Sequence, residues 1–247
     1  MRYLVVSDIH SNWEALEAVL AASQGAYDEV LCCGDLVGYG ADPNRVVNWV
    51  RQSVNVVVRG NHDRACAGIE NLEWFNPVAR TATLWTQNEL TEENRTYLRL
   101  LPKGPLSVEG FQLMHGSPLD EDEYLMNPDE ATEAFAYLET SIAFFGHTHV
   151  QGGFEWRQRN VRNLAKLARD YDGISTFDLN PNAAYLINPG SVGQPRDGDA
   201  RASFVLYDSA ASYLNFHRVA YNLETAQRKI VSAGLPDFLA QRLGVGR

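Results

Sequence analysis

The sequence predicts a mixed α/β protein, because short apolar runs alternate with segments of helical periodicity. Each apolar run is rich in β-branched or aromatic residues and ends abruptly at a polar residue or glycine; the runs are YLVVS, EVLCC, VNVVV, FQLM, IAFF and AYLI. Continuous apolar runs of this length are typical of strands covered on both faces. A sheet shielded on two sides is therefore expected.

The first half of the chain is predicted to be a parallel strand and helix arrangement. Asn12 can cap a helix over WEALEAVLAAS, and Pro43 stands at the first turn of a helix over NRVVNWVRQ. An Asn side chain accepts hydrogen bonds from the free N–H groups of a helix start, and proline is tolerated there because its missing N–H would be unpaired anyway. Strands that alternate with helices favour parallel pairing with the helices as crossovers.

Two further helices are predicted downstream, one that opens at Pro77 and continues through ARTATLWTQNEL, and one over TEENRTYLRLL. From about Pro105 onward, the segments SVEG, FQLMHG, SFVLYD and YLNFHRV indicate hairpin-like strand pairing. The tail LETAQRKIVSAGLPDFLAQRLG predicts two short amphipathic helices divided by Gly234 and Pro236. We expect a single domain over residues 1–247, in which residues 222–247 form a C-terminal helical cap.

The composition argues against several classes of protein. A chain of 247 residues with 45% hydrophobic residues can bury a large core, but 21 basic against 31 acidic residues give a net charge of -10. That charge disfavours binding to nucleic acid polymers. The N-terminal apolar run meets a carboxylate after a few residues, so a signal peptide is not expected. No apolar run approaches the roughly 18 residues of a membrane span. With only three cysteines, a cytoplasmic protein without a membrane partner is expected.

Polar side chains gather where the predicted strands end. Five of the six histidines follow a predicted strand within a few residues. Because the carboxyl ends of strands in an open α/β sheet face one crevice, residues distant in sequence can converge there. The converging set would comprise Asp8, His10, Asp35, Asn61, His115, His147 and His149. Carboxylate, imidazole and amide groups together form a ligand set for two divalent metal ions.

The spacing of these residues supports a ligand role. In Asp8-Ile9-His10 and in His147-Thr148-His149 the outer side chains point the same way if the segment stays extended. Asp35 follows Gly34, where the absence of a side chain allows close approach, and its two carboxylate oxygens could bridge two ions. A single motif of this kind can be an ordinary turn, but five in one chain favour a metal site.

The motifs SDIH, CGD, RGNHD, MHG and FGHTH, in this order, resemble the signature of the calcineurin-like metallophosphoesterase superfamily. The segments SDIHSNWEALEAVL, GDLVGYGADPN, YLINPGSVGQPRDGD and AGLPDFLAQRLG further resemble a bacterial and archaeal subgroup of small phosphoesterases, related to YfcE-like phosphodiesterases and often labelled diadenosine-tetraphosphatase-like. The resemblance implies a four-layer αββα sandwich of two mixed β-sheets flanked by helices.

The resemblance also implies a division of the ligands. One ion would be held by Asp8, His10 and His149, the other by Asn61, His115 and His147, and Asp35 would bridge them. Imidazole ligands suit transition metals, so we expect two divalent ions per chain, manganese first, with iron, zinc, cobalt or nickel as alternatives. Such a pair can polarise phosphoryl oxygens and provide a metal-bound hydroxide as nucleophile.

His62 is assigned a separate role. Neighbouring residues on a turn point in different directions, so if Asn61 binds metal, His62 can reach the leaving oxygen and act as general acid. Asp63 would then orient the imidazole and raise its pKa through its opposite charge. The alternative is that His62 only forms hydrogen bonds within a loop.

Three further residues are candidates for substrate binding, each with a structural alternative. Asn12 either contacts substrate or caps the first helix. Tyr39 either lines the mouth of the site or packs in a turn. Arg196 either meets a substrate phosphate or forms a surface salt bridge with Asp197 or Asp199.

Arg59 and Arg64 are weaker candidates for phosphate contacts. The insert over residues 152–182 is locally basic. It is expected to be a solvated face, with a cover for an anionic substrate as the alternative.

We therefore expect a phosphodiesterase acting on a small phosphoester, with a nucleotide as one candidate substrate and homo-oligomerisation left open. The alternatives are a phosphomonoesterase resembling protein Ser/Thr phosphatases, a hydrolase of dinucleoside polyphosphates, and a non-catalytic scaffold that binds partner proteins. A comparison of diester with monoester substrates separates the chemical classes. Absence of any metal-dependent hydrolysis would favour the scaffold.

Overall fold

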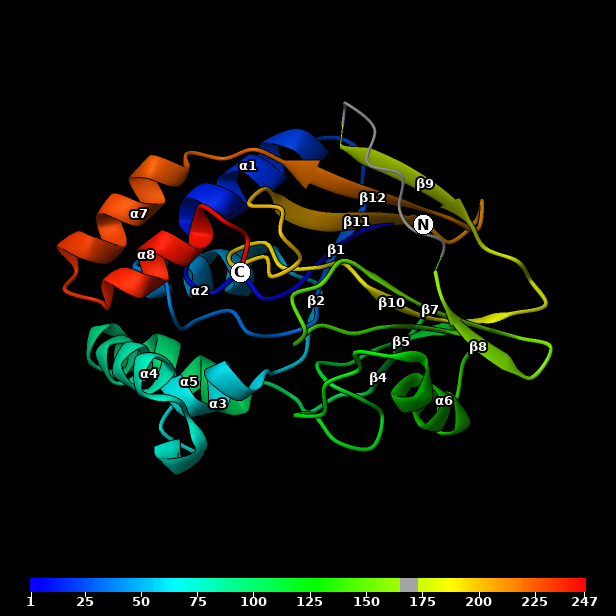
Figure 1. Ribbon diagram of the computed structural model, residues 1–247, viewed down its shortest axis with the longest axis horizontal. Helices are drawn as coiled ribbons and strands as arrows, with labels where there is room; N and C mark the ends of the chain where they lie inside the picture. The colour runs from blue at the N-terminus through cyan, green and yellow to red at the C-terminus, as the bar shows by residue number, and fades with distance from the viewer. Residues whose placement is uncertain (165–172) are drawn as a thin grey trace.

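Two mixed β-sheets of six strands each pack face to face at the centre of the molecule (Figure 1). The computed structural model describes residues 1–164 and 173–247. The first sheet has the order β3 (Val56–Val57), β2 (Glu29–Cys32), β1 (Arg2–Val6), β11 (Ala202–Asp208), β12 (Tyr213–Val219) and β9 (Ile174–Asp178). The second has the order β4 (Leu106–Val108), β5 (Phe111–Leu113), β6 (Ile142–Phe144), β10 (Ala184–Asn188), β7 (Gly152–Arg157) and β8 (Asn160–Asn163).

Parallel pairing aligns the strand ends that carry the predicted ligands. In the first sheet β1, β2 and β3 are parallel, as predicted, with Val6 opposite Cys32 and Cys32 opposite Val57. In the second sheet β5, β6 and β10 are also parallel. Each sheet therefore presents several carboxyl strand ends at one edge.

The hairpin prediction for the second half holds for only some of its strands. β4 with β5 and β11 with β12 form antiparallel pairs. The parallel pairing of β5 and β6 was not predicted. It arises because an unpredicted helix, α6 (Pro128–Ala136), lies between these strands in sequence and serves as the crossover.

The predicted helices are all present. They are α1 (Trp13–Ser23), α2 (Pro43–Ser53), α4 (Pro77–Glu89), α5 (Glu92–Leu100), α7 (Leu223–Ser232) and α8 (Asp237–Leu243). The sequence did not predict the short helices α3 (Asn61–Cys66) and η1 (Leu72–Trp74), nor the three strands β7, β8 and β9. Asn61 and His62, which were expected to lie on a turn, instead open α3, a helix of six residues.

The alternation of side chains along β1 builds two hydrophobic layers at once. Leu4 and Val6 pack against the helices of the first sheet, whereas Tyr3 and Val5 face the second sheet. A third layer forms where α6 packs on the outer face of the second sheet, through residues such as Phe135. The four-layer αββα sandwich implied by the resemblance is confirmed (Figure 1).

The basic insert over residues 152–182 contributes edge strands. β7 and β8 form an antiparallel hairpin at one edge of the second sheet, and β9 is the edge strand of the first. Within the hairpin, Arg162 pairs with Glu155. The part of the predicted insert over 165–172 lies outside the described residues.

The three cysteines, Cys32, Cys33 and Cys66, are buried and unpaired. None of the helices in the described parts of the chain combines the length and the apolar composition that a bilayer crossing requires.

The core between the sheets should depend strongly on Phe111. Its ring is 1% exposed and lies edge-on to Tyr3 at 5.1 Å and to Phe144 at 5.6 Å between centroids. Phe111→Ala should lower the free energy of unfolding by about 3–5 kcal/mol, because the cavity cannot collapse between two sheets. Chemical denaturation monitors the change. Phe238→Ala, at an exposed position on α8, is the control and should change stability by less than about 1 kcal/mol.

Candidate metal centre

The backbone at the strand ends adopts an uncommon conformation. Asp8, His10, Asp35, His147 and His149 all have positive φ, between 47° and 65°. Non-glycine residues rarely occupy this region, and such strain is typical of functional sites. The extended geometry assumed for the two Asp-X-His and His-X-His motifs is therefore wrong, although their side chains still converge.

The Asp35 carboxylate lies at the centre of the converging groups. Its Oδ1 accepts a hydrogen bond of 2.9 Å from the N–H of His62. Its Oδ2 lies 3.6 Å from His10 Nε2 and 3.5 Å from His115 Nε2, and receives no hydrogen bond from any described residue. One carboxylate oxygen thus faces imidazoles from two sides.

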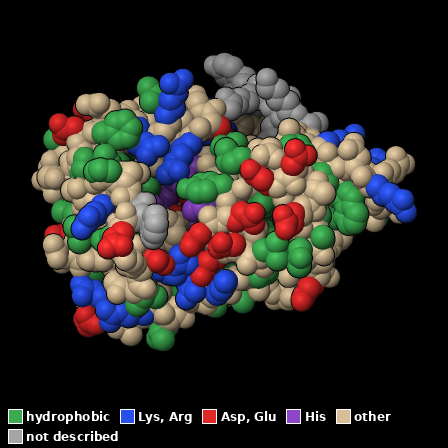
Figure 2. Space-filling view, turned by 60° about the horizontal axis from the view of Figure 1, so that its bottom comes forward, with side chains coloured by type: hydrophobic (Ala, Val, Ile, Leu, Met, Phe, Trp, Pro, Cys, Tyr) green, Lys and Arg blue, Asp and Glu red, His purple; other side chains and the backbone are tan. Residues whose placement is uncertain are grey.

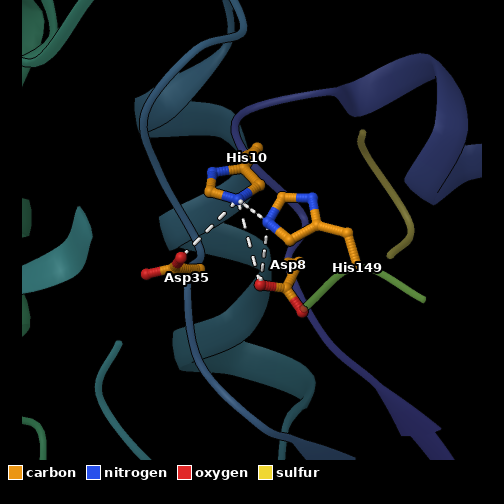
Figure 3. A group of neighbouring side chains, drawn as sticks. All are labelled: Asp8, His10, Asp35 and His149. Carbon is orange, nitrogen blue, oxygen red and sulfur yellow. Dashed lines mark hydrogen bonds and ion pairs between the residues drawn. The ribbon is translucent and has the colours of Figure 1, made fainter. Parts of the chain in front are cut away.

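Two groups of potential ligands share Asp35. In the first group, His149 Nε2 is 3.3 Å from Asp8 Oδ1 and 3.2 Å from His10 Nε2 (Figure 3). In the second, His115 Nε2 is 3.1 Å from His147 Nδ1. Within each group the ligand atoms lie within 4.8 Å of one another. The structure therefore brings together the six predicted carboxylate and imidazole ligands in two adjacent clusters.

Main-chain carbonyls fix the orientation of all four imidazoles. They are Val37 O for His10 Nδ1, at 2.9 Å, Cys33 O for His115 Nδ1, at 2.7 Å, Gln194 O for His149 Nδ1, at 2.6 Å, and Asp122 O for His147 Nε2, at 3.0 Å. A carbonyl only accepts, so the ring nitrogen that faces it carries the proton. In a neutral imidazole the other nitrogen then presents a lone pair to the centre, an arrangement typical of metal-binding histidines.

Unpartnered acceptors at the centre also fit a cation. Asp8 Oδ1, Asp35 Oδ2 and Asn61 Oδ1 are buried, and within the described part of the chain none of them has a hydrogen-bond partner. Buried acceptors without a partner are costly. Asn61 is the first residue of α3. Carboxylate and amide oxygens among inward-facing imidazoles suit divalent metal ions, so the residues present fit the predicted pair of ions.

The pKa values at the centre diverge. Burial raises the pKa of Asp8 to about 7 and holds the pKa of His10 and of His149 well below the usual value. For His115, burial alone would lower the pKa, but the adjacent Asp35 carboxylate outweighs it and raises the pKa to about 10. Opposed shifts of neighbouring groups are typical of sites that bind ions or perform acid–base chemistry.

His62 lies next to the ligand groups in an aromatic wall. Its ring centroid is 4.4 Å from Tyr39, 5.0 Å from His10 and 5.3 Å from Phe75. Burial lowers the pKa of His62 to about 4.

The expected role of Asp63 needs correction. Its carboxylate accepts hydrogen bonds from the N–H groups of Gly60, Leu36 and Val37, at 3.0, 2.8 and 3.3 Å. Asp63 is the third residue of α3, so its side chain reaches the free N–H group of Gly60 at the start of this helix. It also reaches the N–H groups of Leu36 and Val37, in the loop that follows Asp35. It therefore holds these loops together instead of orienting His62, and the expected rise in the pKa of His62 is wrong.

Of the three candidate substrate residues, Asn12 is used structurally. Its Oδ1 accepts from Ala15 N at 3.1 Å, and its Nδ2 donates to Gly193 O at 2.9 Å. The first contact is the predicted helix cap, and the second joins the start of α1 to the loop of Gly193. Tyr39 lies in the wall of the site, 4.7 Å from the His10 ring.

Arg196 forms neither of the predicted salt bridges. Asp197 pairs with Arg218, and Asp199 pairs with Arg201. Arg196 instead donates to Gln194 Oε1 at 3.0 Å, and its guanidinium lies 5.9 Å from the Tyr39 ring centroid. It is thus next to the wall that contains His10 and His62.

Arg59 and Arg64 are occupied by carboxylates. Arg59 binds both oxygens of Glu121 at 2.8 Å, and Arg64 contacts Glu121 and Asp122 at 2.6 Å each. Sequence reasoning missed this network, because no pattern near either arginine indicates partners about 60 residues away. Figure 2 shows histidines at the floor of a hollow bordered by hydrophobic, basic and acidic side chains.

Comparisons with known proteins show the family and the fold to which this chain is similar. Residues 1–212 match the family model of the calcineurin-like phosphoesterase superfamily domain. The chain is 37% identical to uncharacterized protein MJ0912 of Methanocaldococcus jannaschii, over 98% of this chain and 97% of that protein. A metallophosphoesterase from Sphaerobacter thermophilus aligns with 38% identity and a TM-score of 0.86, over 100% and 99% of the two chains. Hypothetical protein PH1004 from Pyrococcus horikoshii shares the fold, with 19% identity and a TM-score of 0.77, over 100% and 98%.

Metal binding should stabilise the folded chain through Asp35. An ion present at a hundred times its Kd stabilises a protein by about 2.7 kcal/mol, which corresponds to a rise in Tm of roughly 5–10 °C for a chain of this size. Addition of manganese to chelator-treated protein should therefore raise Tm, as measured by calorimetry. Asp35→Asn should remove most of the rise, while Asp178→Asn, on the exposed edge strand β9, should keep it. If no divalent ion raises the Tm of the wild-type chain, the metal centre is contradicted.

Proposed function

The chain belongs to the calcineurin-like phosphoesterase superfamily, and on this premise we propose that it is a phosphodiesterase that uses two divalent metal ions. One observation carries the proposal. Asp35 Oδ2, which no described residue engages in a hydrogen bond, lies almost equally far from His10 Nε2 and His115 Nε2. This carboxylate belongs to both ligand groups, which supports a role in holding both ions.

The ligands divide between two positions. Asp8, His10 and His149 would hold one ion, Asn61, His115 and His147 the other, and Asp35 both. The many imidazoles favour manganese or another transition metal over magnesium. When bound, divalent ions at these positions would supply Lewis-acid polarisation of the phosphoryl oxygens and would lower the pKa of the attacking water.

His62 would donate the proton to the leaving oxygen. Its ring is perpendicular to that of His10 at 5.0 Å, so it adjoins the ligand group without belonging to it. Burial lowers its pKa to about 4. The negative charge of a bound phosphoester favours the protonated imidazole, so the acid form would be generated together with the substrate complex.

The distribution of arginines supports a diester over a monoester. Arg59 and Arg64 are neutralised by Glu121 and Asp122. Arg196 has no carboxylate of the described ranges within salt-bridge distance, and would contact the substrate phosphate from the Tyr39 side. The guanidinium of Arg196 alone would match the single negative charge of a diester better than the double charge of a monoester.

A second candidate is hydrolysis of dinucleoside polyphosphates. Tyr124 is 47% exposed and its ring lies 3.9 Å from that of His147. An exposed aromatic ring beside the centre could stack on a nucleobase. In either case the substrate would be a small phosphoester. The protein would act in the cytoplasm, whose reducing conditions suit the three unpaired cysteines.

Reconstitution tests the proposed reaction directly. Metal-free protein is loaded separately with manganese, cobalt, nickel, zinc or magnesium, and assayed with bis-p-nitrophenyl phosphate and p-nitrophenyl phosphate. We expect metal-dependent hydrolysis, fastest with a transition metal, and a higher kcat/KM for the diester. Preference for the monoester would reverse the diester assignment. Full activity in chelator, with no metal in the protein, would overturn the mechanism.

His62 should matter most when the leaving group is poor. His62→Asn should lower kcat by about 10²–10⁴-fold on a dinucleotide, whose alkoxide needs a proton, but less on bis-p-nitrophenyl phosphate, because nitrophenolate leaves unprotonated. Both ions should still bind. The matched control is His217→Asn in β12, whose ring stacks on Phe204 at 4.6 Å. Equal losses on the two substrates would remove His62 from the acid role.

A further inference from the structure

His147 is held differently from the other imidazoles of the centre. It presents Nδ1 to its neighbours and directs Nε2 to Asp122 O at 3.0 Å, whereas His10, His115 and His149 present Nε2. The ring of Tyr124 covers it at 3.9 Å. Asp122 and Tyr124 both belong to the segment of residues 116–125, named here the 116–125 loop. The position of His147 therefore depends on this loop.

The 116–125 loop has its own internal order. Ser117 Oγ accepts from the N–H groups of Leu119 and Asp120, and Asp120 Oδ1 accepts from Asp122 N at 2.9 Å. A side chain at Gly116 would lie 2.7 Å from the carbonyl oxygens of Asp120 and Glu121, so the loop folds back against its own start. That start directly follows the ligand His115. The loop is therefore an ordered unit that directly follows His115 and supports His147 through Asp122 O.

One buried arginine attaches this unit to α3. The side chain of Arg64 is 8% exposed, and its Nη2 and Nη1 lie 2.6 Å from Asp122 Oδ2 and Glu121 Oε1. A third carboxylate, of Glu70, is 3.0 Å away. Removal of one partner from a buried ion pair leaves uncompensated charge, so the contact constrains both segments strongly.

Arg64 thereby connects two segments that carry or orient members of one ligand group. It lies in the same short helix as Asn61, and it binds the loop that begins after His115 and that orients His147. The other group is supported elsewhere, since Val37 O orients His10 and Gln194 O orients His149. The side-chain supports of the two groups thus differ, although the groups share Asp35 and are joined by the hydrogen bond from His147 N to Asp8 Oδ2 at 3.2 Å.

We propose that Arg64 is a positioning residue for the metal position of Asn61, His115 and His147, acting through Asp122 on His147. The Arg64 side chain contacts Glu70, Glu121 and Asp122 and does not contact Val37 or Gln194, which orient His10 and His149, so the position of Asp8, His10 and His149 should be affected much less. This inference rests on the two-ion site of the proposed function. Loss of a group that orients a metal ligand typically costs 10–100-fold in affinity, so loss of Arg64 should weaken one position selectively.

Equilibrium dialysis against buffered free manganese measures both dissociation constants of the full-length chain. Wild type should take up two ions. Arg64→Gln should bind one ion within about twofold of wild type and the second at least tenfold more weakly. Arg64→Lys, which restores the charge but only one contact, should recover part of the loss. Arg51→Gln is the matched control, because Arg51 pairs with Glu93 at an exposed site on α2, and should bind both ions as wild type does.

A second variant separates positioning from general damage. Asp122→Asn keeps the main-chain carbonyl that His147 contacts but weakens its attachment to Arg64, so it should lower the same affinity in the same direction, and less. It also provides the test if Arg64→Gln does not fold. Unchanged affinities in both variants, or equal weakening of both ions, would overturn the role of Arg64. Failure of the wild-type chain to bind two ions would instead overturn the proposed function, and this inference with it.

Discussion

The buried carboxylate of Asp35 is the constraint on which the arrangement of the centre depends. Its Oδ1 is fixed by the N–H of His62 at the start of α3, and its Oδ2 faces His10 and His115. This geometry requires that the chain approach very closely. A side chain at Gly60 would lie 2.1 Å from Asp35 Oδ1, and one at Gly34 2.8 Å from Gly60 N. The glycines of the CGD and RGNHD motifs are therefore needed for packing around a carboxylate, in addition to any freedom that they give to the backbone.

The centre spans the junction of the two sheets, and its ligands are joined across that junction. His147, which follows β6 in the second sheet, donates its N–H to Asp8 Oδ2 at 3.2 Å, and Asp8 follows β1 in the first. At Gly146 a side chain would lie 2.1 Å from Ser7 Oγ, so the two strand ends touch. The aromatic core between the sheets fixes the distance at which this contact occurs. Packing far from the centre thus determines how closely its two ligand groups approach.

The convergence of the carboxylates and imidazoles could be predicted from the sequence because each follows an apolar strand, and parallel strands carry such residues to one edge. The stacking of the two sheets came from resemblance, since apolar runs do not reveal which sheet a strand joins. The role of Asp63 could not be predicted, because a helix of six residues has no periodicity to distinguish it from a turn. The partners of Arg64 were equally hidden, since Glu121 and Asp122 lie in a stretch of acidic residues that resembles an ordinary solvated loop.

Charge compensation explains why the arginines near the centre differ in kind. A site that concentrates the carboxylates of Asp8 and Asp35 attracts cations, and a free arginine close to them would compete for the same carboxylates. Arg59 and Arg64 are prevented from doing so because Glu121, Asp122 and Glu70 bind them. The resulting ion pairs hold loops in place. Arg196 approaches from the Tyr39 side, where its guanidinium contacts Gln194 and no described carboxylate. Of these three arginines, Arg196 is therefore the one whose charge no described carboxylate compensates.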